Sequence, residues 1–157
     1  MRKGRRKAAT VAESAVPYAP RRILLDTHVW LWTVEGVRDL GRRTARFIER
    51  WAEQDALRIS PLSVFEIAAL HASGRLHLSK SPEHWIALAL ENTGARLAPL
   101  PMEAALEAGA IGTVPDPIDR LLIGTARQTD ATLVTADRRI LEYGKSAYGF
   151  AVHDARR

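Results

Sequence analysis

The amino-acid sequence predicts an α/β domain built on an open, parallel β-sheet. Ile23-Leu24-Leu25 is a run of large apolar residues that no polar residue interrupts, which is typical of a strand buried on both faces. Further along, short apolar runs alternate with longer helical patterns, and this alternation favours βα units. With 157 residues, of which 46% are hydrophobic, the chain is long enough for one domain with a sizeable core.

The first strand ends on an acid, Asp26. A helical run over residues 29–35 follows, so Asp26 lies at a strand-to-helix turn. In open parallel sheets, ligands bind just outside the carboxyl ends of the strands. Asp is also a favoured helix N-cap. Asp26 therefore has two interpretations, a site residue or a cap.

A second helix is predicted over residues 42–53, after breaks at two glycines. Phe47, Ile48 and Trp51 form its apolar stripe. Arginines recur every four residues on a neighbouring face. Such a row could track phosphates, but two nearby glutamates favour a solvated face.

A short strand is predicted over residues 57–59, and Ser60-Pro61 then starts a helix that runs to Ser73. Glu66 lies too deep in this helix to be a cap. On an apolar face, an ionised acid is costly unless something pairs with it. The predicted buried stripe that Glu66 interrupts consists of Leu62, Phe65, Ala69 and Leu70.

The second half of the chain repeats the alternation of helices and strands. Asp116-Pro117 is a well-formed helix start with Asp119 at the third position, so local chemistry explains both acids without any function. The next strand ends near another acid, Asp137. The predicted elements are helices over 81–94, 102–111, 116–129 and 138–143, with Gly144 behind the last, and strands over 95–100, 131–135 and 148–152.

The net charge of +5 is unevenly distributed along the chain. Residues 1–22 carry +6, and the other 135 residues sum to −1. We expect residues 1–21 to be a basic, disordered tail, either inert or a weak nucleic-acid arm, rather than a targeting segment. The domain is expected over 22–152, with 153–157 as a C-terminal tail. No cysteine and no membrane-length apolar run is present, which favours the cytoplasm.

Acids recur at the positions that such a fold brings together. Asp26 and Asp137 follow strands, Asp116 and Asp119 open a helix, and Glu66 lies on a helix face. Gathering these carboxylates at one sheet edge would raise their pKa values, and a divalent cation would remove the repulsion. Oxygen ligands without cysteine select Mg²⁺ or Mn²⁺, and the five histidines show no zinc-ligand spacing.

Four motifs carry a resemblance to a known family over residues 22–152. In order and spacing they resemble those of the PIN domain and, within it, the VapC-type toxin ribonucleases of prokaryotic toxin-antitoxin modules. The motifs are Leu24-Leu25-Asp26-Thr27-His28, Ser63-Val64-Phe65-Glu66-Ile67, Asp116-Pro117-Ile118-Asp119-Arg120-Leu121-Leu122-Ile123 and Leu133-Val134-Thr135-Ala136-Asp137.

This resemblance implies a three-layer α/β/α sandwich with a parallel, roughly five-stranded central sheet. It also implies a Mg²⁺- or Mn²⁺-dependent endoribonuclease that acts as the toxin of a module, with an RNA substrate, a cognate antitoxin protein and a homodimeric state. By the same resemblance, the catalytic and metal-binding acids are Asp26, Glu66, Asp119 and Asp137, with Asp116 and Thr135 as possible helpers.

Two alternatives remain open at this point. A phosphatase or receiver-like phosphate-handling protein also places acids at strand ends, but it usually needs an Asp-x-Asp or adjacent acid pair, whereas Thr27 and His28 follow Asp26. A catalytically inactive PIN-like RNA-binding protein is the second alternative, and the four intact acids argue against it.

Overall fold

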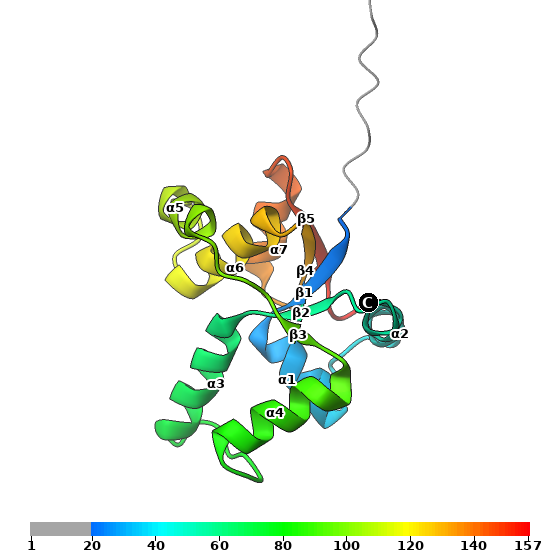
Figure 1. Ribbon diagram of the computed structural model, residues 1–157. Helices are drawn as coiled ribbons and strands as arrows, with labels where there is room; N and C mark the ends of the chain where they lie inside the picture. The colour runs from blue at the N-terminus through cyan, green and yellow to red at the C-terminus, as the bar shows by residue number, and fades with distance from the viewer. Residues whose placement is uncertain (1–19) are drawn as a thin grey trace, which may run out of the picture.

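The computed structural model describes residues 20–157, which fold around a five-stranded sheet in which every strand pair is parallel (Figure 1). The spatial order is β3-β2-β1-β4-β5. Successive strands therefore extend from β1 first toward one edge and then toward the other, which makes β1 and β4 the topological switch point. The strands are β1 Arg22–Leu25, β2 Leu57–Ile59, β3 Arg96–Leu97, β4 Ala131–Thr135 and β5 Ala151–Asp154.

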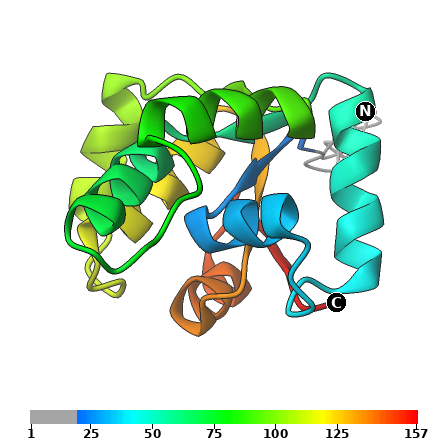
Figure 2. The same ribbon diagram turned by 90° about the horizontal axis from the view of Figure 1, so that it is seen from below.

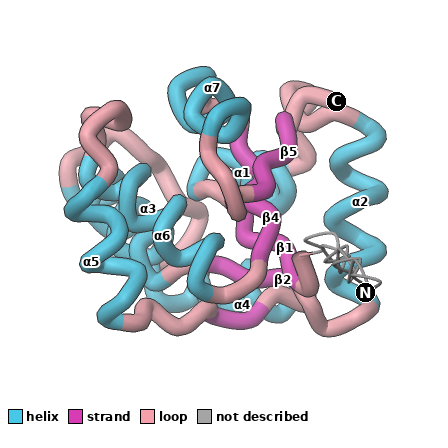
Figure 3. Tube along the Cα trace, turned by 90° about the horizontal axis from the view of Figure 1, so that it is seen from above, coloured by secondary structure: helices cyan, strands magenta, loops and turns pink. Residues whose placement is uncertain are grey.

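Seven helices of the described part cover the two faces of this sheet. Helices α1 to α4 contribute to the core on one face, where Trp30 and Trp85 meet edge to face. Figure 2 shows α1 and α4 on this side of the sheet. Helices α6 and α7 cover the other face, and α5 packs on α6 (Figure 3). The helices are α1 Thr27–Glu35, α2 Arg42–Glu53, α3 Pro61–Ala72, α4 Pro82–Thr93, α5 Met102–Ala110, α6 Pro117–Gln128 and α7 Arg138–Ser146.

Strand β1 is buried on both faces, as its apolar run predicts. Ile23 and Leu25 belong to the core under α1 to α4, whereas Leu24 belongs to the core under α6 and α7. All three side chains are fully buried. The predicted three-layer α/β/α sandwich with a parallel five-stranded sheet is confirmed.

The C-terminal elements differ from the sequence prediction. Helix α7 continues through Gly144 instead of ending before it. A Cβ atom at Gly144 would lie 2.2 Å from Cγ1 of Val152, so this glycine permits close packing of β5 rather than ending the helix. The strand expected over 148–152 begins at Ala151, because Tyr148 is 96% exposed and Gly149 turns with a φ of +67°.

Residues 153–157, expected as a tail, form part of the fold. Strand β5 extends to Asp154, and the next residue, Ala155, is fully buried. The Gly41 amide donates to the Ala155 carbonyl, and the Thr44 amide at the start of α2 donates to the carbonyl of Arg157. These bonds attach the C-terminus to α2.

Two other expectations concern the edge strand and the N-terminal segment. Strand β3 is shorter than the predicted 95–100, since Pro99 has no amide to continue the pairing. The basic tail expected over residues 1–21 lies almost wholly outside the described residues. Within residues 20–157, we find no helix with the length and apolar character that a bilayer crossing requires.

Candidate functional site

The carboxyl ends of β1 and β4 bring two predicted site residues together at the switch point. Asp26 directly follows β1, and its Oδ2 accepts a 2.6 Å hydrogen bond from the hydroxyl of Thr135, the last residue of β4. The Thr135 hydroxyl in turn accepts from the Asp137 amide at 3.0 Å. One buried hydroxyl therefore links the acids that follow the two central strands.

Asp26 occupies the N-cap position of α1, but its side chain makes no capping hydrogen bond. The cap interpretation of this carboxylate is therefore wrong. Burial raises the pKa of Asp26, while the Thr135 hydroxyl and the nearby His28 lower it. His28 itself is exposed, so its ring lies at the solvent side of the acids.

Glu66 reaches the same edge of the sheet from α3. Its Oε1 accepts a 2.6 Å hydrogen bond from the Thr27 hydroxyl, and that hydroxyl lies 2.9 Å from Oγ of Ser63. Burial raises the pKa of Glu66, the Thr27 hydrogen bond lowers it, and the charge of Asp26 raises it further. The predicted need of this acid for a partner is met by a hydroxyl group.

The predicted buried stripe of α3 is wrong. Ser63 and Ile67, one turn apart, are the buried residues, while Phe65 is 61% exposed and Ala69 is exposed. Helix α3 carries its own apolar side chains on most of its faces, so the spacing of these residues does not single out one buried face. Only the packing of α3 against α1 and α4 selects the buried face.

Asp116 and Asp137 act as helix caps in the structure. The Asp116 carboxylate accepts from the amides of Ile118 and Asp119 at 2.7 and 3.2 Å. The Asp137 carboxylate accepts in the same way from the first turn of α7, at 2.7 and 3.2 Å. Each uses its Oδ1 for both bonds, which leaves the second oxygen of each carboxylate without a capping role.

The pKa of Asp119 is raised by the negative charges of all the other acids of the site. Burial and the negative charges of four other acids raise the pKa of Asp119 to about 7. This is the mutual repulsion that the sequence predicts for gathered carboxylates. In decreasing order of effect, the four acids are Asp116, Asp26, Asp137 and Glu66. We call these five residues the acid cluster.

The donor set of the acid cluster fits a hard divalent cation by its chemistry. All its members are carboxylates, and the pKa values of Asp26, Glu66 and Asp119 are raised mainly because burial disfavours their charge. A bound cation would reverse that preference. Among residues 20–157, however, no three acidic, histidine or cysteine side chains stand close enough to form a ready-made metal cage.

Sequence reasoning missed the hydroxyl groups of Thr27 and Ser63 as parts of this site. Both side chains are fully buried, and together they hold Glu66 against the end of β1. A hydroxyl directly after the strand-ending acid, and another one turn before Glu66, were the available signals. Threonine and serine are also ordinary residues at the start of a helix, so neither signal is specific to a functional site.

Removal of the Thr135 hydroxyl should damage both stability and the site. We expect Thr135→Val to lower the free energy of unfolding by about 1–3 kcal/mol, because it leaves the buried Asp26 carboxylate and the Asp137 amide without their partner. The pKa of Asp26 should rise further, since this hydroxyl lowers it. Urea unfolding in EDTA at neutral pH measures the effect.

Two variants on β4 provide the controls. Thr135→Ser keeps the hydroxyl and should retain most of the stability. Thr132→Val removes from the same strand a hydroxyl that makes no hydrogen bond within residues 20–157, and should change stability little. A Thr135→Val protein as stable as Thr132→Val would show that the link between Asp26 and Asp137 is energetically unimportant.

The chain was compared with protein-family models and with sequences of known proteins. The model described as the PIN domain matches residues 23–146. The chain is 31% identical over 119 residues to a protein named Ribonuclease VapC22 from Mycobacterium tuberculosis (strain ATCC 25618 / H37Rv). That match covers 75% of this chain and 88% of the relative.

Solved structures share the fold at low sequence identity. The crystal structure of VapBC2 from Rickettsia felis, bound to a DNA fragment from their promoter, matches with a TM-score of 0.62 and 14% identity, over 83% of this chain and 96% of the other. The crystal structure of DNA-bound VapBC from Salmonella typhimurium matches with a TM-score of 0.57 and 20% identity, over 85% and 97%.

Proposed function

Because this chain belongs to the PIN domain family, we propose that it is a divalent-metal-dependent endoribonuclease of the VapC type, the toxin of a toxin-antitoxin module. The observation that carries this proposal is the acid cluster at the β1/β4 switch point, where four charges act on Asp119. The named relative supports RNA as the substrate, since it is called a ribonuclease.

Four residues of the cluster would hold the metal: Asp26, Glu66, Asp119 and Asp137. When bound there, Mg²⁺ or Mn²⁺ would supply an activated water and steady the leaving oxygen of a phosphodiester. The protein's own contribution is to hold the carboxylates in place. Thr135 holds Asp26, and Thr27 holds Glu66. Asp116 mainly caps the first turn of α6, which carries Asp119.

A surface groove beside the cluster supports a polyanionic substrate. Arg138 and Arg139 directly follow Asp137 at the start of α7 and line a groove of about 620 Å³, in which the one acid, Glu142, is paired with Lys145. Tyr143, one turn further along the same helix, adds an aromatic edge to the groove, while its ring packs against Phe150. These residues place cations beside Asp137, where an RNA strand would enter.

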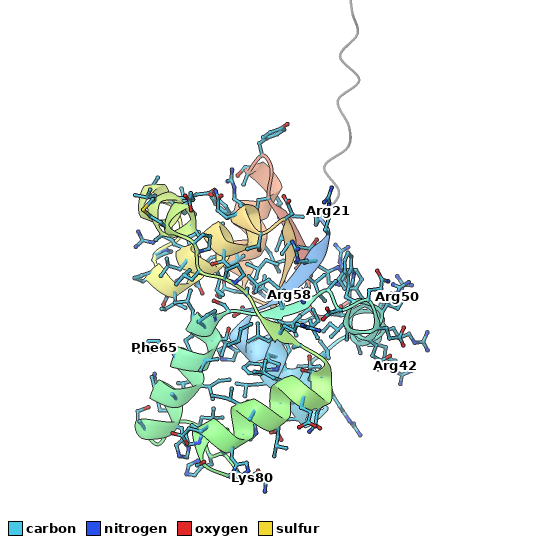
Figure 4. All side chains as sticks on the ribbon, in the orientation of Figure 1. Arg21, Arg42, Arg50, Arg58, Phe65 and Lys80 are labelled. Atoms are coloured by element: carbon cyan, nitrogen blue, oxygen red, sulfur yellow. The ribbon has the colours of Figure 1, made fainter. Side chains whose placement is uncertain are left out.

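The proposal includes two protein partners. VapBC complexes share the fold, which favours a cognate antitoxin for this chain. A second copy of the chain is the other partner, supported by exposed apolar side chains on α3 and α5, namely Phe65, Met102 and Leu106. Figures 3 and 4 show both helices on one side of the molecule, with Phe65 directed outward.

The strand order argues against a receiver-like alternative. Doubly wound receiver-type sheets have the order 2-1-3-4-5, whereas this sheet has the order 3-2-1-4-5. Only a cleavage assay can distinguish an enzyme from an inactive RNA-binding protein with the same fold. Purified protein incubated with labelled RNA in Mg²⁺, Mn²⁺ or EDTA is therefore the direct test of the proposal, and cleavage should occur only with a metal present.

The ends of the RNA products should show how the bond is broken. We expect 5′-phosphate and 3′-hydroxyl ends, because water attacks phosphorus and the ribose 2′-hydroxyl takes no part. Mass spectrometry of the products, with and without phosphatase treatment, identifies these ends. A substrate with a single 2′-deoxy sugar at the cleaved position should still be cut.

Cyclic-phosphate ends, or protection by that single deoxy sugar, would contradict this chemistry and require a base that activates the 2′-hydroxyl. Cleavage that persists in EDTA would contradict the metal dependence. Asp119→Asn purified in parallel controls for contaminating ribonucleases, since these would be unaffected by the substitution.

A further inference from the structure

A second basic groove lies away from the acid cluster, on the face of the sheet that α6 covers. It has a volume of about 390 Å³ and begins where β1 begins and α6 ends. The groove is lined by Arg22, Arg58, Ala98, Pro99, Gln128 and Thr129. None of these lining residues is an acid.

Strand register brings the two arginines onto one face. Leu24 points into the core under α6, and Arg22, two residues earlier on β1, shares that face. Arg58 of β2 pairs with Leu24, so its side chain projects on the same side. In Figure 4, Arg58 lies beside the central strands, whereas Arg42 and Arg50 project from α2.

Neither arginine has a carboxylate partner among residues 20–157. The Nη1 of Arg22 donates to the Thr129 carbonyl at 3.1 Å, and Nη1 of Arg58 donates to the carbonyls of Asp55 and Leu57, both at 2.9 Å. The Asp55 carboxylate itself is paired with Nε of Arg96 at 2.6 Å. A guanidinium has five N–H donors, so most donors of both arginines remain available.

The positive charge of the groove favours binding of an anion. Both arginines are half-buried, which removes part of their hydration. Burial lowers the pKa of Arg58, the positive charges of Arg22 and Arg96 act in the same direction, and only Asp55 opposes them. The groove along α2 differs, because Glu49 and Glu53 line it together with its arginines and offset their charge.

The groove is separate from the place of cleavage. Asp26 lies four positions after Arg22 along β1, a distance of about 13 Å. Gln128 lies nine positions after Asp119 along α6, a distance that is also about 13 Å. One phosphate therefore cannot occupy the groove and the acid cluster at the same time.

From this geometry we infer that the groove of Arg22 and Arg58 is a remote binding site for a backbone phosphate of the RNA strand that is cut at the acid cluster. Both guanidinium groups contact the phosphate, and Pro99 and Ala98 provide an apolar wall for the sugar or base of that nucleotide. This inference rests on the proposed ribonuclease function, because that function makes a single RNA strand the ligand.

The test is equilibrium binding of a labelled, unstructured single-stranded RNA to the full chain in EDTA, over a range of salt concentrations. Arg58→Gln should weaken binding about five- to tenfold at low salt and reduce the slope of log K against log salt by about 0.7. Arg58→Lys keeps the charge and should keep most of the slope. Arg38→Gln, an exposed arginine outside the groove, is the matched control and should leave the slope unchanged.

In the cleavage assay with metal, Arg58→Gln should raise KM for the same RNA and leave kcat nearly unchanged, because the groove is remote from the reacting phosphorus. Gln128→Glu tests the groove without altering an arginine. Gln128 is exposed, and an acid on this wall should weaken RNA binding in the same direction.

Equal affinity and salt slope for wild type, Arg58→Gln and Gln128→Glu would overturn the inference, even if the wild type cleaves RNA as proposed. Loss of binding in both groove variants, together with a wild type that never cleaves RNA, would support the groove and contradict the proposed function. The two failures are thus distinguishable.

Discussion

Asp119→Asn is expected to reduce RNA cleavage by about a hundredfold or more and at the same time to stabilise the metal-free protein at pH 8. The loss of activity follows from removing one of the acids that would hold the metal. The gain in stability follows from removing a carboxylate whose pKa is raised by burial and by four neighbouring negative charges to about 7.

The sign of the pH dependence follows from that raised pKa. The folded protein holds the Asp119 proton up to about pH 7, whereas the unfolded chain releases it near the ordinary value of 3.8. The wild type should therefore lose stability as the pH rises from about 4 to about 7 in EDTA. Because the carboxyl is half-buried and solvent screens its charge, we expect a loss of about 1–2 kcal/mol.

Unfolding by urea at several pH values, in EDTA, measures this effect. The Asp119→Asn protein should be more stable than the wild type at pH 8 and nearly equal to it below about pH 3, where the wild-type carboxyl is protonated in the folded and in the unfolded state. Metal provides a second measurement. The wild type should gain roughly 2.7 kcal/mol at a metal concentration one hundred times its Kd, and Asp119→Asn should gain far less at that concentration.

Asp116→Ala is the matched control at the same helix start. Loss of the cap should lower the free energy of unfolding by about 1 kcal/mol, measured at pH 5, where Asp119 is mostly protonated in the folded protein. Activity should fall much less than in Asp119→Asn. An Asp119→Asn protein that is destabilised without metal, yet keeps its activity and its metal-dependent gain, would show that Asp119 is structural.

Gly124→Ala should destabilise the protein by about 1–3 kcal/mol and also reduce activity. A Cβ atom at Gly124 would lie 2.4 Å from the backbone carbonyl oxygen of Ala104, so α6 and α5 would have to separate. Helix α6 carries Asp119 in its first turn, and its displacement would move this carboxylate away from the other acids. Urea unfolding and the cleavage assay measure the two effects.

Gly109→Ala is the matched control on the neighbouring helix. Gly109 is exposed on α5, and a Cβ atom there would meet nothing within 4 Å. The substitution should therefore stabilise the protein by up to about 1 kcal/mol, because alanine is a better helix former. If both substitutions had the same sign, helix propensity rather than the contact between α5 and α6 would dominate at Gly124.

The sequence by itself determined the fold class. The run Ile23-Leu24-Leu25 could be read as a doubly buried strand, because an isolated apolar run has few other stable placements. The helix cap at Asp116 was also readable, since capping depends on neighbours in sequence. The family resemblance needed only the order and spacing of four motifs.

Only the tertiary structure decided what Asp26 and Glu66 contact. Asp26 fits a cap by sequence, yet its carboxylate bonds to Thr135, which lies 109 residues away on the adjacent strand. The buried face of α3 was equally undetermined, because an apolar helix has no preferred face until its neighbours pack against it. Gly144 signals a helix end by sequence, yet close packing of β5 places it inside α7.

The basic groove of Arg22 and Arg58 was likewise decided by the tertiary structure and not by the sequence composition. Outside its first 22 residues the chain is nearly neutral, and composition therefore predicts no basic surface. Arg22 and Arg58 are far apart in sequence, but β1 and β2 are paired neighbours whose register places both side chains on one face. Charge in a sequence is a sum over residues, whereas a binding site depends on which charges the sheet brings together, and that is set by strand register and packing.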